Sequence, residues 1–271
     1  MTPTFRRRRL ARRLRQMREQ AGLTLEEAAR LLDKTRSSLG RIETGQSRAD
    51  VHLARSMMDF YDIYDPELLD LVREANRPGW WTKYGTDERG YISMETDAST
   101  LRELAIINIP GLLQTEPYMR AQFAAHRLPA DRVEAEVKIR LFRQRRLLDE
   151  EFPLELVAII DEAALRKRVG GVDVMRGQLR RLAESAELPT VSIQVLPDAA
   201  GSHPGADGAY TILSFPEGDP SLLYVAYVLG AIHIEKPDEV SQARLKFDQL
   251  RSEALSPMES VALIERLAGE L

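Results

Sequence analysis

Basic and hydroxyl side chains are interleaved with apolar ones in the stretch DKTRSSLGRIETG, residues 33 to 45. On a helix, Arg36, Ser37 and Arg41 share one face, and Leu39 and Ile42 lie opposite them. An arginine can bond both major-groove acceptors of guanine, and hydroxyls near a helix N-terminus suit phosphate oxygens. The stretch therefore predicts a helix that offers its outward face to nucleic acid.

The charge of the chain is divided unevenly along its length. Residues 1–48 hold thirteen Lys and Arg against five Asp and Glu, a balance of +8, whereas the whole chain of 271 residues carries −4. Such a basic head on an acidic body is typical of a protein with one nucleic-acid-binding end. For the run Arg6–Arg9 alone, three interpretations stay open: a minor-groove arm, a phosphate-binding arm or a disordered tail.

Helical signals surround this basic stretch and predict an all-α head of five helices. Thr24 and Glu27 form a capping box at the start of the helix before it, and Thr35 is the expected N-cap of the basic helix, which Gly45 ends. Asp65 is expected to cap the last helix, with Pro66 as its first residue. The other two helices are expected at residues 5–20 and 50–60.

Two consecutive helices joined by a turn of about four residues form the helix-turn-helix arrangement, whose second helix enters the DNA major groove. The stretch LRQMREQAGLTLEEAARLLDKTRSSLGRIETGQSR resembles the XRE-type, or Cro/cI-type, helix-turn-helix in its Ala-Gly-Leu-Thr entry, its Ala-Ala pair and its Ile-Glu-x-Gly exit. Gly40 departs from this pattern, since a polar or bulky residue is usual there.

The resemblance implies roles for individual residues. Arg18 and Glu43 would form a buried structural ion pair. The bases would be read by Arg36, Ser37 and Arg41. The phosphates would be contacted by Thr35, Ser38, Gln46, Ser47 and Arg48, and Lys34 is a further expected DNA-binding residue.

Beyond residue 98 the periodicity changes from helical to mixed. Strand-like apolar runs occur at 101–108, 154–160, 191–197, 209–215, 222–228 and 231–235, and helical stretches at 116–126, 131–149, 172–186, 238–254 and 257–269. We expect a helix-turn-helix domain at 1–76, a linker at 77–98 and an α+β domain at 99–271, with a mixed or antiparallel sheet of about five to six strands.

Catalytic and metal-binding residues are not expected in this second domain. The chain has no cysteine, and its four histidines lack metal-ligand spacing, so neither a metal nor a cofactor is predicted. Asp161 and Glu162 read as the acidic first turn of a helix. Ser202 and His203 are adjacent in a Gly/Pro-rich loop, which is no nucleophile–base geometry. The chain is therefore predicted not to be an enzyme.

Five stretches of the second domain resemble the companion domain of Scr/WhiJ-like actinobacterial regulators, among them IPGLLQTEPYMRA (109–121) and IIDEAALRKRVGG (159–171). Regulators of this group are commonly encoded beside a small protein thought to modulate them, so the resemblance implies that the domain senses a small partner protein or a ligand.

The expected function is sequence-specific binding of double-stranded DNA by a transcriptional regulator. Because one such head reads a half-site, a homodimer is expected. No apolar run is long enough for a membrane span or a signal peptide, which favours a cytoplasmic protein. Two alternatives stay open: an antitoxin-like autoregulator that sequesters a neighbouring small protein, and a hydrolase-like enzyme recruited to DNA.

Overall fold

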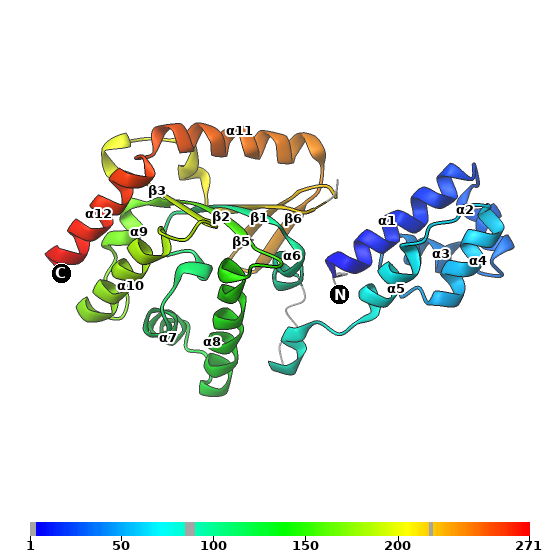
Figure 1. Ribbon diagram of the computed structural model, residues 1–271, viewed down its shortest axis with the longest axis horizontal. Coiled ribbons are helices and arrows are strands. Elements are labelled where there is room, and N and C mark those ends of the chain that lie inside the picture. The colour runs from blue at the N-terminus through cyan, green and yellow to red at the C-terminus, as the bar shows by residue number, and fades with distance from the viewer. Residues whose placement is uncertain (1–3, 85–89, 217–218) are drawn as a thin grey trace. The chain divides into compact units, whose positions relative to one another are not determined.

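The computed structural model describes residues 4–84, 90–216 and 219–271. The chain divides into two compact units, Met1–Asp97 and Ala98–Leu271. The first is helical and the second is α+β with a mixed sheet, which confirms the predicted fold class (Figure 1). Every helix in the described ranges is too short or too polar to cross a bilayer.

The first unit contains the five predicted helices and two further short ones. In order they are α1 (Phe5–Gln20), α2 (Leu25–Leu31), α3 (Arg36–Glu43), α4 (Val51–Tyr61), α5 (Leu68–Asn76), the 3-10 helix η1 (Trp80–Tyr84) and α6 (Tyr91–Asp97). The apolar faces of α1 to α5 share one core, which includes Leu14, Met17, Ala28, Leu39, Ile42, Met57 and Leu68. Each helix thus buries the stripe that its sequence period marks out.

The start of α5 corrects one prediction. Asp65 is not its N-cap: the helix begins at Leu68, and Glu67 occupies the cap position without a side-chain bond. The Asp65 carboxylate instead accepts from the backbone N–H of Glu67 at 3.0 Å and from Arg13 Nε at 2.6 Å. Asp65 therefore links α1 to the turn that precedes α5, and the helix begins at Leu68.

The run Arg6–Arg9 is helical and belongs to α1, so it is not a disordered tail. Arg6 Nη2 lies 2.7 Å from Asp97 Oδ1, at the end of α6. Residues 77–98, predicted as a linker, contain η1 and α6, and both belong to the first unit up to Asp97. Residues 85–89 of that segment lie outside the described residues.

In the described part of the second unit, one six-stranded sheet has the order β3-β2-β1-β4-β5-β6. Its strands are β1 (Thr100–Ala105), β2 (Glu155–Asp161), β3 (Val191–Leu196), β4 (Tyr210–Ser214), β5 (Leu222–Tyr227) and β6 (Gly230–Ile234). β1, β2 and β3 are parallel, whereas β4, β5 and β6 continue the sheet as an antiparallel meander.

Helices cover both faces of the parallel half, which is why β2 reads as a nearly continuous apolar run. One face carries α11 (Pro237–Glu253), whose Val240, Phe247 and Leu250 pack on Leu104 and Ile159. On the other side lie α7 (Glu116–Ala125), α8 (Ala130–Gln144) and α10 (Val172–Ser185), as Figure 1 shows. The remaining elements are α9 (Glu162–Arg166), α12 (Pro257–Glu270) and the 3-10 helices η2 (Gly111–Leu113), η3 (Arg145–Leu148), η4 (Asp198–Ala200) and η5 (Pro204–Asp207).

Candidate nucleic-acid interface

Two short capped helices build the candidate site. Thr24 Oγ1 accepts from the N–H of Glu27 at 3.3 Å, and a Glu27 carboxylate oxygen accepts from the N–H of Thr24 at 2.8 Å, so α2 begins with the predicted capping box. Residues 32–35 form the turn, in which Asp33 takes a left-handed conformation with φ 52°. Thr35 Oγ1 then accepts from the N–H of Ser38 at 3.1 Å and begins α3 as predicted.

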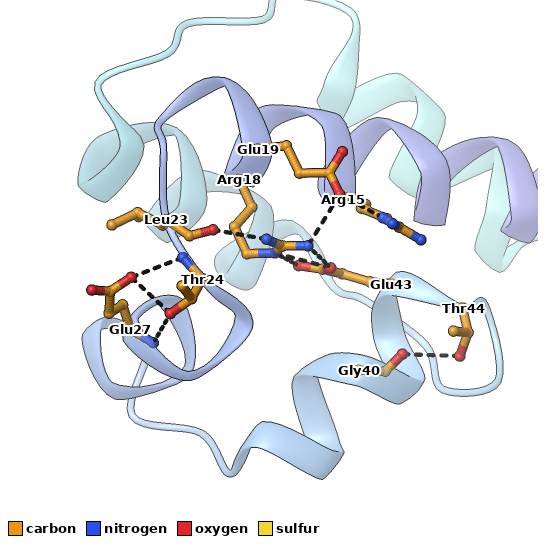
Figure 2. A network of polar contacts seen from close by, with 9 residues as sticks. All are labelled: Arg15, Arg18, Glu19, Leu23, Thr24, Glu27, Gly40, Glu43 and Thr44. Carbon is orange, nitrogen blue, oxygen red and sulfur yellow. Dashed lines mark hydrogen bonds and ion pairs between the residues drawn. The ribbon is translucent and has the colours of Figure 1, made fainter.

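A two-armed ion pair fixes α3 against α1. Arg18 Nε lies 2.8 Å from Glu43 Oε1, and Arg18 Nη2 lies 3.0 Å from Glu43 Oε2 (Figure 2). A third guanidinium nitrogen, Nη1, donates to the carbonyl of Leu23 at 2.7 Å. The side chains of Arg18 and Glu43 are only 10% and 4% exposed. Arg18 therefore acts as scaffold at the centre of the unit.

The hydrogen bond that Arg18 donates to Glu43 raises the pKa of Arg18 and more than offsets the opposing effect of burial. Tyr61, at the end of α4, is buried beside this pair, and no protein atom in the described ranges forms a hydrogen bond with its hydroxyl. Burial, together with the negative charge of Glu43, raises the pKa of Tyr61 to about 12. Sequence patterns do not reveal this buried hydroxyl, because its charged neighbours come from α1 and α3.

Gly40 lies where α3 crosses α2. A Cβ atom at this position would lie 3.4 Å from Leu25 Cδ2, and no other atom would come within 4 Å. Its carbonyl accepts from Thr44 Oγ1 at 2.9 Å, as Figure 2 shows. A methyl group at this position would therefore be in ordinary van der Waals contact with Leu25.

The predicted base-reading residues Arg36, Ser37 and Arg41 are all exposed on α3, whereas Leu39 and Ile42 are buried beneath them. Thr35 is exposed, and Lys34 and Ser38 are half-buried at the start of the helix. The loop after α3 exposes Gln46 and Arg48 and half-buries Ser47. The structure thus places the predicted contact residues on and around one helix.

Most described arginines of the head outside this surface have polar or charge partners, and Arg55 and Arg77 are the exceptions. Arg15 and Arg30 pair with Glu19 and Glu26 within their own helices. Among the residues that the structure describes, no acid lies within ion-pair distance of Lys34, Arg36, Arg41 or Arg48. Unneutralised cations at the N-terminus and outer face of a helix can bind the phosphates and base edges of a duplex.

The polar residues singled out in the second unit make contacts with the protein itself. Asp161 Oδ1 caps α9 through the N–H of Ala163 at 2.9 Å, and Asp161 Oδ2 lies 3.6 Å from His203 Nε2. The other ring nitrogen of His203 accepts from the N–H of Gly205 at 3.2 Å. Sequence reasoning did not anticipate this Asp–His pair, whose members are 42 positions apart in the sequence.

Glu162 is also engaged: its carboxylate accepts from the N–H of Asp198 at 3.0 Å and from Arg166. Burial alone would raise the pKa of Glu162, but these two hydrogen bonds outweigh it and lower the pKa. Nowhere in the described ranges do three or more His, Cys, Asp or Glu side chains gather in a way that could hold a metal ion.

Comparison with known families finds two matches along the chain. Residues 9–72 match the helix-turn-helix domain HTH_31, and residues 89–266 match a domain of unknown function, DUF5753. The chain belongs to the DUF5753 family. This DUF5753 protein therefore joins a helix-turn-helix domain of DNA-binding regulators to the α+β unit. No curated protein and no solved structure matches it significantly.

Proposed function

We propose that this DUF5753 protein is a dimeric, cytoplasmic transcriptional regulator of the XRE type, in the Scr/WhiJ-like actinobacterial group, which binds a specific operator through α3. The observation that carries the proposal is the exposed surface of Arg36, Arg41 and Arg48, which lacks acidic partners within the described residues. Arg30 on α2, by contrast, is paired with Glu26 of its own helix.

In this proposal Arg36, Ser37 and Arg41 read base edges, because they project from the outer face of α3. Lys34, Thr35, Ser38, Gln46, Ser47 and Arg48 hold the phosphate backbone on either side of that face. Thr35 can cap the helix and bind a phosphate at the same time, since its oxygen accepts from the helix while its O–H remains able to donate.

The α+β unit is proposed to sense a small partner protein or a small ligand and to act without catalysis. The contacts of Asp161, Glu162 and His203 support the non-catalytic part: each of these groups already holds a helix start, a loop or a neighbouring charge.

The test is selection of bound genomic fragments by the full chain at fixed salt, with and without the product of the neighbouring gene. We expect a short, roughly palindromic motif with half-sites about one helical turn apart. Fragments enriched without any shared motif would contradict sequence-specific regulation. An occupancy that the neighbouring product leaves unchanged would contradict the proposed response to a partner protein.

A further inference from the structure

One face of the β5–β6 hairpin is entirely apolar. Side chains alternate along a strand, so Leu223, Val225 and Tyr227 point to the same side. The cross-strand partners of Leu223 and Val225 are Ile234 and Ile232, which lie on that side too. These five residues are called the hairpin strip below.

One end of the hairpin strip is hollow. There a cavity of about 340 Å³ lies over Leu223, Val225 and Ile234. Its opposite wall is the polar edge of α11, with Glu239, Gln242 and Lys246, and the η5 loop contributes Asp207. The charges of this rim have partners, since Lys236 Nζ lies 3.0 Å from Glu239 Oε1 and Lys246 Nζ lies 3.9 Å from Asp207 Oδ2. An uncharged apolar group would therefore enter the cavity without leaving a new charge unpaired.

The other end of the hairpin strip protrudes. Ile232 and Tyr227 are 51% and 54% exposed, and the two turn residues Val228 and Leu229 are 99% and 87% exposed. The positive φ of this turn belongs to Gly230, at 153°, so neither Val228 nor Leu229 is needed for the shape of its backbone. Valine and leucine at this tip leave two large apolar side chains in water. Burial against another surface explains their presence.

We propose that the hairpin strip is an interface between two copies of this chain, with the Val228–Leu229 tip of each copy inserted into the cavity of the other. A two-fold interface requires a surface that complements itself. The strip meets this requirement, because the protruding Val228–Leu229 tip follows it at one end and a hollow with an apolar floor lies at the other. Antiparallel alignment of two strips fills both hollows and covers both tips.

A second copy accounts for the whole strip, whereas a small ligand would fill only the cavity and leave the tip in water. The inference rests on the proposed function in one respect: a regulator that reads two half-sites needs a dimer, and the hairpin strip gives that dimer a location.

The oligomeric state is the first test, measured by light scattering after size exclusion at micromolar concentrations. We expect the natural chain to be a dimer and the double variant Val228→Ser, Leu229→Ser to be at least tenfold weaker in self-association. Leu245→Ser is the matched control, since Leu245 is 71% exposed on α11 and is not a member of the strip. A monomeric natural chain, or a double variant that dimerises unchanged, would overturn the inference.

Cross-linking tests the arrangement itself, and the chain is well suited to it because it contains no cysteine. The variants Val228→Cys and Gln242→Cys are prepared separately, mixed and treated with a short bismaleimide. Tip-to-cavity contact predicts a covalent dimer in the mixture and none from either variant alone. Cross-linking of Val228→Cys with itself, or no cross-link in the mixture, would reject the arrangement. A third outcome is that the purified chain is monomeric and Val228→Cys cross-links to a different polypeptide in cell extract. This outcome would show that the hairpin strip binds another protein and not a second copy of the chain.

Operator binding is measured on the same samples. This distinguishes a failure of the proposed regulatory function from a failure of the proposed interface. Loss of operator binding by every sample, with cross-links intact, would refute the proposed regulator and leave the interface standing. Operator binding by the mixed Val228→Cys and Gln242→Cys variants, without a tip-to-cavity cross-link between them, would refute the interface alone.

Discussion

Arg18 and Arg41 carry the same charge on the same head but have different surroundings. Arg18 is buried and directs its donor groups to Glu43 and Leu23, whereas Arg41 is exposed and has no acidic partner among the described residues. The surroundings, and not the residue type, separate the arginine that supports α3 from those available to a ligand.

Replacing Arg36 or Arg41 with alanine is expected to weaken operator binding and relax base preference, because a bidentate bond from arginine to a base contributes about 1–3 kcal/mol of discrimination. Affinity is measured by fluorescence anisotropy against operator and single-base variants at constant salt. Arg73→Ala is the control, because Arg73 lies on α5 and pairs with Asp70. Unchanged affinity and preference in both variants would show that α3 is not the recognition helix.

Arg18→Ala is expected to destabilise the head by about 3–5 kcal/mol, since it leaves the buried Glu43 carboxylate unpaired. Urea unfolding followed by circular dichroism measures this destabilisation. Arg15→Ala provides the comparison, because Arg15 makes an exposed pair with Glu19 and should cost little. An Arg18→Ala protein that unfolds like the natural chain but no longer binds DNA would make Arg18 a DNA ligand.

Tyr61 should make the stability of the head sensitive to alkaline pH. Its folded pKa is about 12, against about 10 in an unfolded chain, so the unfolded state ionises first and stability falls as pH rises from about 10 to 12. Tyr61→Phe should reduce this fall, and should not lower stability at pH 7 because the hydroxyl has no hydrogen bond in the described residues. Urea unfolding at pH 9, 10 and 11 tests both points. Tyr64→Phe, at an 83% exposed position, is the control and should change neither.

The helix starts of the head can be predicted from the sequence where the capping residue and its hydrogen-bond partner are close together along the chain. The capping box of α2 and the Thr35 cap of α3 lie where the sequence predicts them, because donor and acceptor are three residues apart. Asp65 is not the N-cap of α5, and its ion pair with Arg13, 52 positions away, could not be predicted from the local sequence. The Asp161–His203 pair could not be predicted for the same reason: strand register and loop path bring its members together.

Gly40→Ala is expected to stabilise α3 by up to about 1 kcal/mol, since alanine favours helix and its methyl group meets only Leu25 at van der Waals distance. Operator affinity should stay unchanged, because the methyl group points to α2. Urea unfolding measures the stability, and fluorescence anisotropy measures the operator affinity. The bulkier Gly40→Leu serves as the opposing variant and should be less stable. A destabilised alanine variant would mean that α2 and α3 pack too closely at Gly40 to accommodate a methyl group.

On the scale of the whole molecule, the basic first 48 residues and the acidic remainder determine how the protein approaches DNA. The acidic part repels phosphate, so attraction is confined to the head, and its strength must depend on salt. This division can be predicted from composition alone, whereas the partners of individual charges can be known only from the folded head.

Arg48→Ala is expected to lower operator affinity uniformly across sequences and to reduce the slope of log affinity against log salt concentration by about 1, as removal of one phosphate-binding cation does. Anisotropy titrations at several KCl concentrations, on operator and on unrelated duplex, give the slope. Arg77→Ala, on the residue that follows α5, should leave it unchanged. A slope equal to that of the natural chain would show that Arg48 does not bind phosphate.

The mixed sheet has a consequence for the order of folding. β4, β5 and β6 are joined by short connections, so their meander can form from local contacts. β1 lies at the centre of the sheet and needs β2, about 50 positions later, on one edge and β4, about 110 positions later, on the other. Closing those long loops is slow, and the second unit cannot complete its core until most of its chain is available. Its exposed hairpin would therefore be finished while the centre of the sheet is still open.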